Sequence, residues 1–288
     1  MSKRGTSRAT SSSASRRPTG SSPAGVSLSH NESMMVRSMN RSMENHPTDQ
    51  HSLPKSILLH LSPGVFLTLA FVLLKPILDP TGYPPLLAFL LAALLVDLTF
   101  MLGVMLSEGK KRNGRYSLRG VVGYRNRLPG RTFAAVFAGA FVIVYLLIML
   151  VTPLEASLKE GLFSSFPSWF FLDEQSQYEA YPRGILIMVF TLQIAVTGVL
   201  LPWVEELYFR GYLLPRISRF GRWTPLLGGL LFGLYHIWQL YSFPTVFLLG
   251  LALAYIVWRT RDIRLSISLH VVANTLTRLA FLMVALAM

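Results

Sequence analysis

Long apolar stretches separated by short polar connections occupy most of the chain after residue 52. Each stretch is close to the ~20 residues that a helix needs to cross the hydrocarbon of a bilayer. We expect seven such segments, at about 56–75, 85–106, 132–153, 184–210, 224–241, 244–259 and 265–286. The pattern predicts an all-α fold, a polytopic membrane helix bundle of about seven transmembrane helices.

The first 52 residues have a different composition, which is dominated by Ser, Thr, Arg, Gly and Pro. Such a segment buries too little apolar surface to offset the entropy of ordering, so we expect residues 1–52 to be a disordered basic tail. Its basic residues suit anionic lipid headgroups. A solvated tail and an over-extended chain start are the simpler readings. The membrane domain is then expected over residues 53–288.

The sign of the charge alternates from one connection to the next, and this alternation predicts how the protein is oriented in the membrane. The connection 107–131 is strongly basic, whereas 154–182 is acidic, and arginines again follow the fourth and sixth segments. Basic loops stay in the cytoplasm during insertion. Seven spans with a cytosolic N-terminus place every basic connection inside. The sequence therefore predicts an integral, multi-pass protein, which we assign to a bacterial plasma membrane because no targeting signal precedes the spans.

Composition changes this picture in two ways. The chain is 52% hydrophobic and only 14% charged, with a mean hydropathy of +0.46, whereas soluble domains carry about a quarter charged residues. The formal net charge of +13 is therefore assigned to basic loops and not to nucleic-acid binding. Cysteine is absent, which excludes disulfides, thiol catalysis and thiolate metal ligands.

Few strongly polar side chains remain inside the apolar segments. A charge at the bilayer centre costs roughly 2.5 to 3.5 kcal/mol on the mildest scale, so these residues are functional candidates. They form three sets, which are Glu205, Glu206 and Arg210 in the fourth segment, Phe232 and His236 in the fifth, and His270 and Asn274 in the seventh. Each set alone also has a structural reading, as a solvated helix end, a packing histidine or an interhelical hydrogen-bonding pair.

Helical spacing divides the roles within the first set. Glu206 and Arg210 are four residues apart and share a helix face, in the favourable Glu-before-Arg order. Glu205 is turned about 100° away from Glu206. We therefore expect Arg210 to hold Glu206 and Glu205 to face another helix.

Taken together, the three sets supply the groups that hydrolyse an unactivated amide. A glutamate acts as a general base toward water, and a histidine shares the proton or orients the water. A second histidine and a carboxamide N–H donate to the developing oxyanion. Hydrolysis within a bilayer also needs a polar cavity that admits water.

The pattern Glu205-Glu206-x-x-x-Arg210, Phe232-x-x-x-His236 and His270-x-x-x-Asn274 resembles the CPBP family. This family groups type II CAAX prenyl endopeptidases with bacteriocin-processing and bacteriocin-immunity membrane proteins, also called ABI-domain proteins. The resemblance covers residues 184–286, with the motifs in the family's order. It implies an all-helical intramembrane endopeptidase whose catalytic cavity opens toward the cytosol.

The resemblance also implies roles for the individual residues. Glu205 and His236 would activate the hydrolytic water, and His270 and Asn274 would stabilise the oxyanion. Glu206 and Arg210, with Phe232, would support the first glutamate. Its substrate would be a membrane-tethered or lipidated peptide or protein, while the substrate's identity and the oligomeric state are not indicated.

No cofactor is predicted, although zinc stays open at this stage. Glu205, His236 and His270 would be its ligands, with an open fourth position. A His-Glu-x-x-His helix is absent from the sequence. A glutamate with two histidines works equally without metal, and we favour that mechanism.

The polar sets also allow two further readings. A non-catalytic membrane immunity or scaffold protein of the same fold would keep the residues for structure. A transporter or proton relay is less favoured, because no internal repeat is present. Asp97 and Arg278 also lie inside apolar segments, and we expect them to form an ion pair across the second and seventh helices.

Overall fold

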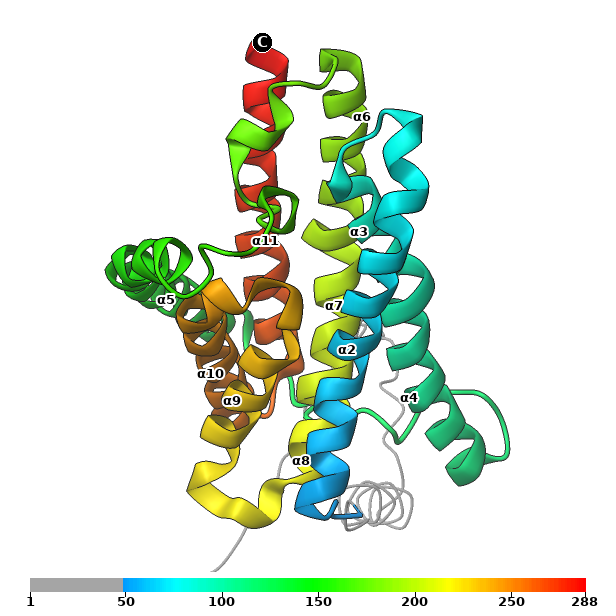
Figure 1. The fold of residues 1–288 in the computed structure, drawn as a ribbon. Helices are drawn as coiled ribbons and strands as arrows, with labels where there is room; N and C mark the ends of the chain where they lie inside the picture. The colour runs from blue at the N-terminus through cyan, green and yellow to red at the C-terminus, as the bar shows by residue number, and fades with distance from the viewer. Residues whose placement is uncertain (1–48) are drawn as a thin grey trace, which may run out of the picture. The chain divides into compact units, whose positions relative to one another are not determined.

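The computed structural model describes residues 49–288, which form helices and connecting loops (Figure 1). Within this range the only extended pairing is an isolated bridge between Arg125 and Asp262. The α-helices are α2 (Leu53–Leu78), α3 (Pro85–Ala92), α4 (Leu98–Asn113), α5 (Gly130–Glu160), α6 (Arg183–Gln193), α7 (Leu201–Glu205), α8 (Leu214–Arg216), α9 (Thr224–Tyr235), α10 (Phe243–Thr260) and α11 (Ile263–Ala287). π-helical segments join several of them, at Ala93–Asp97, Ile194–Leu200 and Glu206–Leu213.

The expected tail lies outside the described residues except for its last positions, 49–52. Ser52 caps α2, since its side-chain oxygen accepts a hydrogen bond from the Lys55 N–H. The His51 N–H donates to the Arg216 carbonyl at 2.8 Å, and the His51 side chain is buried. The packed region therefore starts slightly earlier than residue 53.

The all-helical membrane fold is confirmed, with a smaller number of long helices than expected. Six helical runs in the described chain are long and apolar enough to span a bilayer, namely Leu53–Thr81, Pro85–Asn113, Gly130–Glu160, Arg183–Arg216, Ile237–Thr260 and Ile263–Ala287. The fifth expected span, at about 224–241, is not among them. The described chain therefore has six helical runs of spanning length, one fewer than the seven expected.

The missing span is α9, which has 12 residues. At about 1.5 Å per residue it is ~18 Å long, well short of the ~30 Å of hydrocarbon. The helix stops because the backbone of His236 leaves helical geometry, at φ −78° and ψ 53°, and a short 3₁₀ segment, Ile237–Ser242, follows.

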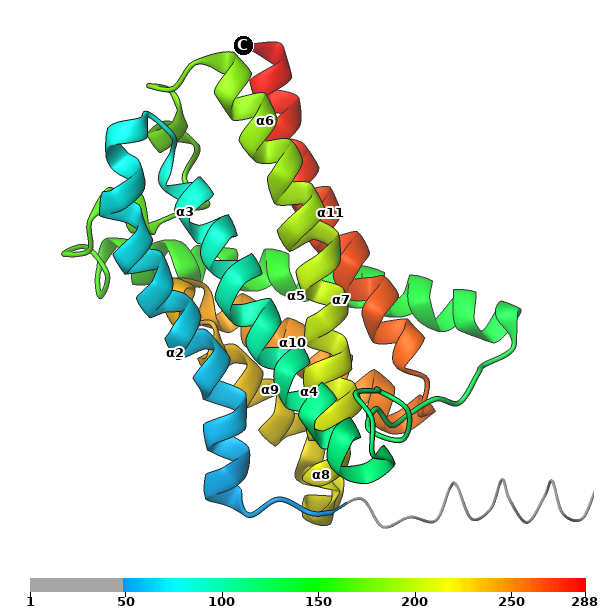
Figure 2. The same ribbon diagram turned by 90° about the vertical axis from the view of Figure 1, so that its right-hand side faces the viewer.

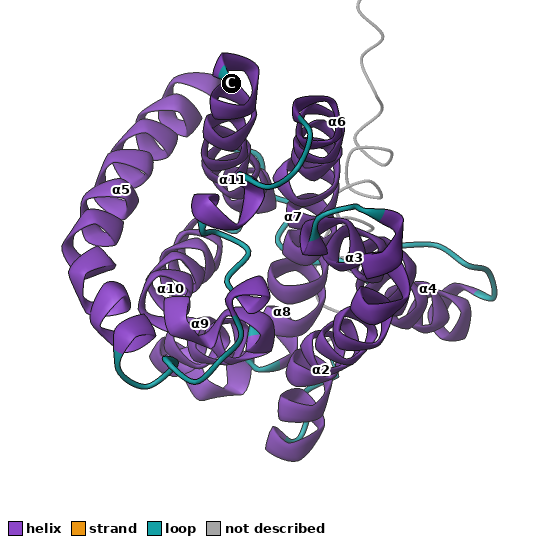
Figure 3. Ribbon diagram, turned by 45° about the horizontal axis from the view of Figure 1, so that its top comes forward, coloured by secondary structure: helices purple, strands orange, loops and turns teal. Residues whose placement is uncertain are grey.

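The shortness of α9 leaves the predicted alternation of basic loops intact. The chain runs up α9 and back down α10, and these two helices pack side by side (Figures 1 and 3). The loops before α9 and after α10 therefore lie at the same end of the bundle. Both loops contain arginines, as the charge pattern requires.

Helix α5 has a direction of its own. Helices α2, α4, α6, α7 and α11 run roughly along one another, whereas α5 crosses them at a steep angle at the periphery (Figure 2). One side of α5 packs on α10 and α11, through Val144, Leu249, Leu253 and Leu269. Most of its remaining surface is exposed and apolar, with Leu150 75% exposed. That surface suits contact with lipid.

Two glycines allow the helices around the centre to approach closely. A Cβ on Gly64 of α2 would lie 1.8 Å from the Tyr235 carbonyl oxygen. A Cβ on Gly229 of α9 would lie 2.7 Å from Leu251 Cα on α10. The end of α9 is therefore held between α2 and α10, and this position fixes where His236 lies.

Candidate catalytic site

A single helical run, Arg183–Arg216, carries the paired glutamates and contains two π-helical segments. Wider π turns interrupt regular α-helical bonding and frequently mark functional sites. In the first of them, the Thr197 carbonyl accepts a hydrogen bond from Asn274 Nδ2 at 3.2 Å. The next carbonyl, of Gly198, accepts from Thr275 Oγ1 at 3.2 Å. The first π segment thus holds α11 and orients Asn274.

Glu206 opens the second π segment and contacts α11 directly, while its partner Arg210 extends the contact to α10. Its Oε1 accepts hydrogen bonds from Arg210 Nη1 and from His270 Nδ1, each at 2.8 Å. Arg210 also donates through Nη2 to the Gly250 carbonyl of α10 at 3.1 Å. The contact between Glu206 and Arg210 expected from their spacing is thus present, and it is fully buried.

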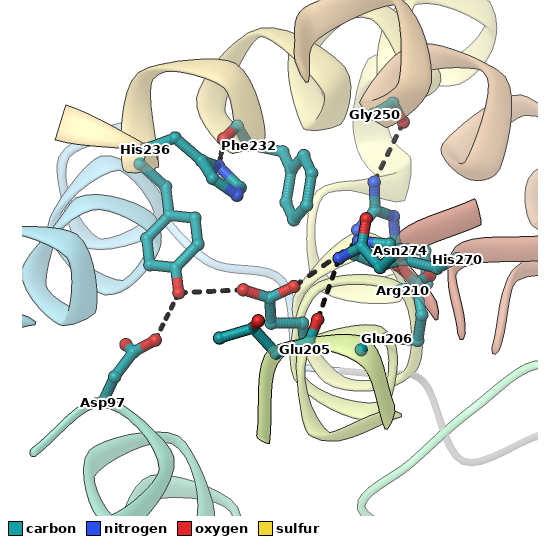
Figure 4. A network of polar contacts seen from close by, with 12 residues as sticks. Asp97, Glu205, Glu206, Arg210, Phe232, His236, Gly250, His270 and Asn274 are labelled. Atoms are coloured by element: carbon teal, nitrogen blue, oxygen red, sulfur yellow. Dashed lines mark hydrogen bonds and ion pairs between the residues drawn. The ribbon is translucent and has the colours of Figure 1, made fainter. Parts of the chain in front are cut away.

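Glu205 points away from Glu206, toward α9 and α11 (Figure 4). Its Oε2 lies 3.7 Å from His270 Nε2. Its Oε1 lies 3.0 Å from the hydroxyl oxygen of Tyr235, which also hydrogen-bonds to Asp97. Sequence reasoning had not included Tyr235. A polar side chain directly preceding His236 in an apolar segment was the available signal.

The end of α9 orients His236. Its Nδ1 donates to the Phe232 carbonyl at 2.9 Å, which satisfies one of the free carbonyls of a helix C-terminus. With the hydrogen on Nδ1, the neutral ring has an acceptor at Nε2. The Phe232 ring packs against the His236 ring at 4.7 Å and against the Arg210 guanidinium at 4.0 Å. Phe232 thereby separates the two polar groups.

One cavity of about 330 Å³ collects the four candidate catalytic residues, Glu205, His236, His270 and Asn274. Glu206 and Arg210 are not among its lining residues. Apolar side chains such as Phe89, Leu201 and Val246 form much of its wall. The cavity is within the size range of ligand sites, about 300–1,000 Å³. Its polar groups supply proton acceptors and hydrogen-bond donors around a space large enough for water.

The expected ion pair between Asp97 and Arg278 is not formed. Asp97 is fully buried and hydrogen-bonds to Tyr235 on the side of Glu205 away from His270. Arg278 instead lines the cavity, one helical turn beyond Asn274. The sequence placed both residues inside spans, but the position of a residue within a span does not determine which side chain of another helix it contacts.

A metal centre does not fit the arrangement of the described residues. Between residues 49 and 288 no group of three or more His, Asp or Glu side chains is close enough to hold an ion. Glu205, His236 and His270 line one cavity, and both histidine Nδ1 atoms already have partners, so an ion would have only the two Nε2 atoms and the Glu205 carboxylate. These three groups are not close enough together to hold it as they stand.

Comparison with known proteins agrees with the resemblance found in the motifs. Residues 187–276 match the family model described as type II CAAX prenyl endopeptidase Rce1-like. This segment contains all three polar sets. No curated protein and no solved structure matches the chain.

Proposed function

We propose that the protein is an intramembrane endopeptidase, because residues 187–276 match the family model described as type II CAAX prenyl endopeptidase Rce1-like. It hydrolyses a peptide bond in a membrane-tethered or lipidated peptide or protein. The observation that supports this most directly is the convergence of Glu205, His236, His270 and Asn274 on one cavity from three separate helical elements.

The geometry supports a division of labour in which Glu205 and His236 activate water. Glu205 Oε2 and His236 Nε2 are the proton acceptors that line the cavity. As water attacks the carbonyl carbon, its proton moves to Glu205, and the same proton later passes to the departing amine nitrogen. The carboxylate is thereby restored when the peptide bond breaks.

His270 and Asn274 stabilise the oxyanion that forms in this step. Asn274 Nδ2 uses one hydrogen on the Thr197 carbonyl and has a second one available. His270 donates through Nδ1 to Glu206, and a second hydrogen on Nε2 would be the one that it offers to the oxyanion. One such donor contributes about a hundred- to a thousand-fold in rate. Glu206 and Arg210 hold His270 in place and do not line the cavity.

The function is tested by comparing membrane peptides in cells that carry the intact protein with those in cells carrying Glu205→Gln or His236→Ala. A peptide cleaved in the wild-type sample should accumulate uncut in both variants, because each has lost a proton acceptor. Glu160→Gln is the matched control, since Glu160 is an exposed glutamate at the end of α5. Thermal unfolding in detergent monitors folding of every variant.

Two outcomes would contradict the proposal. Full cleavage in Glu205→Gln would remove the mechanism. Unchanged peptides together with a lower unfolding temperature in both variants would favour the alternative, a non-catalytic immunity or scaffold protein of the same fold.

We further propose that the basic loops face the cytosol, as does the N-terminus. The connection between α4 and α5 contains Arg115 and Arg119, whereas the connection between α5 and α6 contains Asp173 and Glu174. Such asymmetry sets orientation during insertion. We assign the protein to a bacterial plasma membrane, with a membrane-associated substrate as its partner.

A further inference from the structure

Three buried oxygen-bearing side chains meet beside the cavity. The Tyr235 hydroxyl lies within hydrogen-bond distance of the Asp97 carboxyl and 3.0 Å from Glu205 Oε1. Tyr235 comes from α9, Asp97 from the π segment that precedes α4, and Glu205 from α7. Asp97 and Tyr235 are 0% exposed and Glu205 is 3% exposed.

Counting hydrogens constrains the protonation of this group. A phenol has a single hydrogen to donate, and an ionised carboxylate only accepts. Both contacts of Tyr235 are hydrogen bonds only if one of the two carboxyls is itself protonated. Two hydrogens then serve three oxygens, with the tyrosine oxygen accepting one and donating the other.

The surroundings decide which carboxyl holds the proton. Asp97 Oδ1 is buried without a hydrogen-bond partner, and no cationic side chain among residues 49–288 forms an ion pair with Asp97. Glu205 has His270 Nε2 at 3.7 Å and lines the cavity. A buried charge without a partner costs far more than a buried neutral acid.

Charge balance leads to the same assignment. Arg210 lies within ion-pair distance of Glu206, and His270 lies within that distance of both glutamates. An ionised Asp97 would add a negative charge that nothing nearby compensates.

We propose that Asp97 holds a proton and donates it in a hydrogen bond to Tyr235, so that the tyrosine hydrogen points to Glu205. Tyr235 and Asp97 are then positioning residues that act through Glu205. They fix Oε1 of the ionised glutamate and leave Oε2 to accept the proton from water. The effect on turnover depends on the proposed function, whereas the protonation of Asp97 does not.

Infrared spectroscopy of the purified full-length protein in detergent tests the protonation directly. A carbonyl-stretching band of a protonated carboxylic acid should be present at neutral pH in the wild type and in Glu205→Gln, and absent in Asp97→Asn. In Tyr235→Phe the same band should shift, because the acid loses its hydrogen-bond acceptor. A band lost in Glu205→Gln and kept in Asp97→Asn would place the proton on Glu205 and overturn the assignment. A spectrum that is unchanged in every variant would also overturn the assignment.

Kinetics on the peptide whose cleavage requires Glu205 test the positioning role. Tyr235→Phe and Asp97→Leu should lower kcat by roughly tenfold to 100-fold with little change in KM. Both variants keep the Glu205 carboxylate, but its position is no longer fixed. Asp97→Asn should recover much of the loss, since its carboxamide N–H still donates to Tyr235. The exposed loop tyrosine provides the control Tyr116→Phe.

The pH profile separates positioning from mere packing. The titratable and charged groups around Glu205 are Tyr235, His270, Glu206, Arg210 and Asp97, and of these Tyr235 is the one that donates a hydrogen bond to Glu205. Removing a hydrogen bond to an ionised carboxylate disfavours that form, so the acid side of the rate profile should move to higher pH in Tyr235→Phe. A lower unfolding temperature with unchanged kcat and pH profile would reduce Tyr235 to a packing residue. If no Glu205-dependent peptide exists, the proposed function fails and the infrared result still decides the protonation.

Discussion

Glu206 is the residue on which the polar centre depends. One of its carboxylate oxygens accepts from both Arg210, in the same helical run, and His270 of α11, and Arg210 in turn donates to the Gly250 carbonyl of α10. Neither Glu206 nor Arg210 is open to the cavity. Their contribution to any reaction is therefore indirect, through the position of His270 and the balance of charge around Glu205.

At the scale of single residues, Arg210→Ala should destabilise the protein strongly. Removing one partner of a buried ion pair leaves an uncompensated charge, at a cost of about 3–5 kcal/mol. The Gly250 carbonyl would lose its donor as well. The measurement is thermal or denaturant unfolding of the purified protein in detergent.

Lys75→Ala is the control for Arg210→Ala. It removes the pair between Lys75 and Asp79, whose carboxyl side chain is 46% exposed, and such pairs contribute about 1 kcal/mol or less. Equal losses in the two variants would show that burial does not distinguish these pairs.

At the scale of elements, interruptions of regular helix place the polar groups. His236 presents its ring because α9 ends there, and Asn274 finds a free carbonyl because Ile194–Leu200 is π-helical. Asp97 also ends a π segment. With uninterrupted α-helices, the His236 and Asp97 side chains would lie elsewhere around their helix axes, and the Thr197 carbonyl would accept a hydrogen bond within its own helix.

The contact between α2 and α9 gives the prediction for this scale. Gly64→Ala places a methyl group 1.8 Å from the Tyr235 carbonyl oxygen, so the helices must separate. Overpacking of this kind costs about 1–3 kcal/mol. Cleavage should fall with it, because Tyr235 and His236 move together.

Gly139→Ala is the matched control, since a Cβ there meets nothing within 4 Å. In a helix interior this change should be neutral or stabilising by about 1 kcal/mol. The unfolding temperatures of the two variants measure this difference in stability. A Gly64→Ala protein as stable and active as Gly139→Ala would mean that α2 and α9 are less closely packed than described.

At the scale of the whole molecule, α5 and the α9–α10 pair distinguish this fold from a simple bundle. α5 crosses the other long helices and contributes Tyr145, Ile148 and Glu155 to the cavity wall (Figures 1 and 2). The α9–α10 pair returns the chain to the end from which it came. The cavity is therefore bounded by helices that differ from one another in direction and in length.

Orientation in the membrane can be measured because the chain has no cysteine. A single cysteine at Arg115, in the basic connection, should react with a membrane-impermeant maleimide only after the cells are permeabilised. A single cysteine at Gln175, in the acidic connection, should react with intact cells. The physical reason is retention of basic loops in the cytosol. The reverse labelling pattern would invert the proposed topology.

The sequence by itself determined the fold class and most of the candidate site. Hydrophobic runs alone require a membrane helix bundle, because a bilayer offers no water to unpaired backbone groups. The i, i+4 spacing put Glu206 beside Arg210. Residues of the three motifs could be named because polar side chains within hydrocarbon are costly and therefore few.

Only the tertiary structure decided which neighbours these polar residues meet. It set Asp97 against Tyr235 and not Arg278, ended α9 at His236, and turned α5 across the bundle. Helical period fixes the face of a helix on which a side chain lies, but not the rotation and tilt of one helix against another. Those depend on close contacts such as Gly64 against Tyr235, which join residues far apart in the chain.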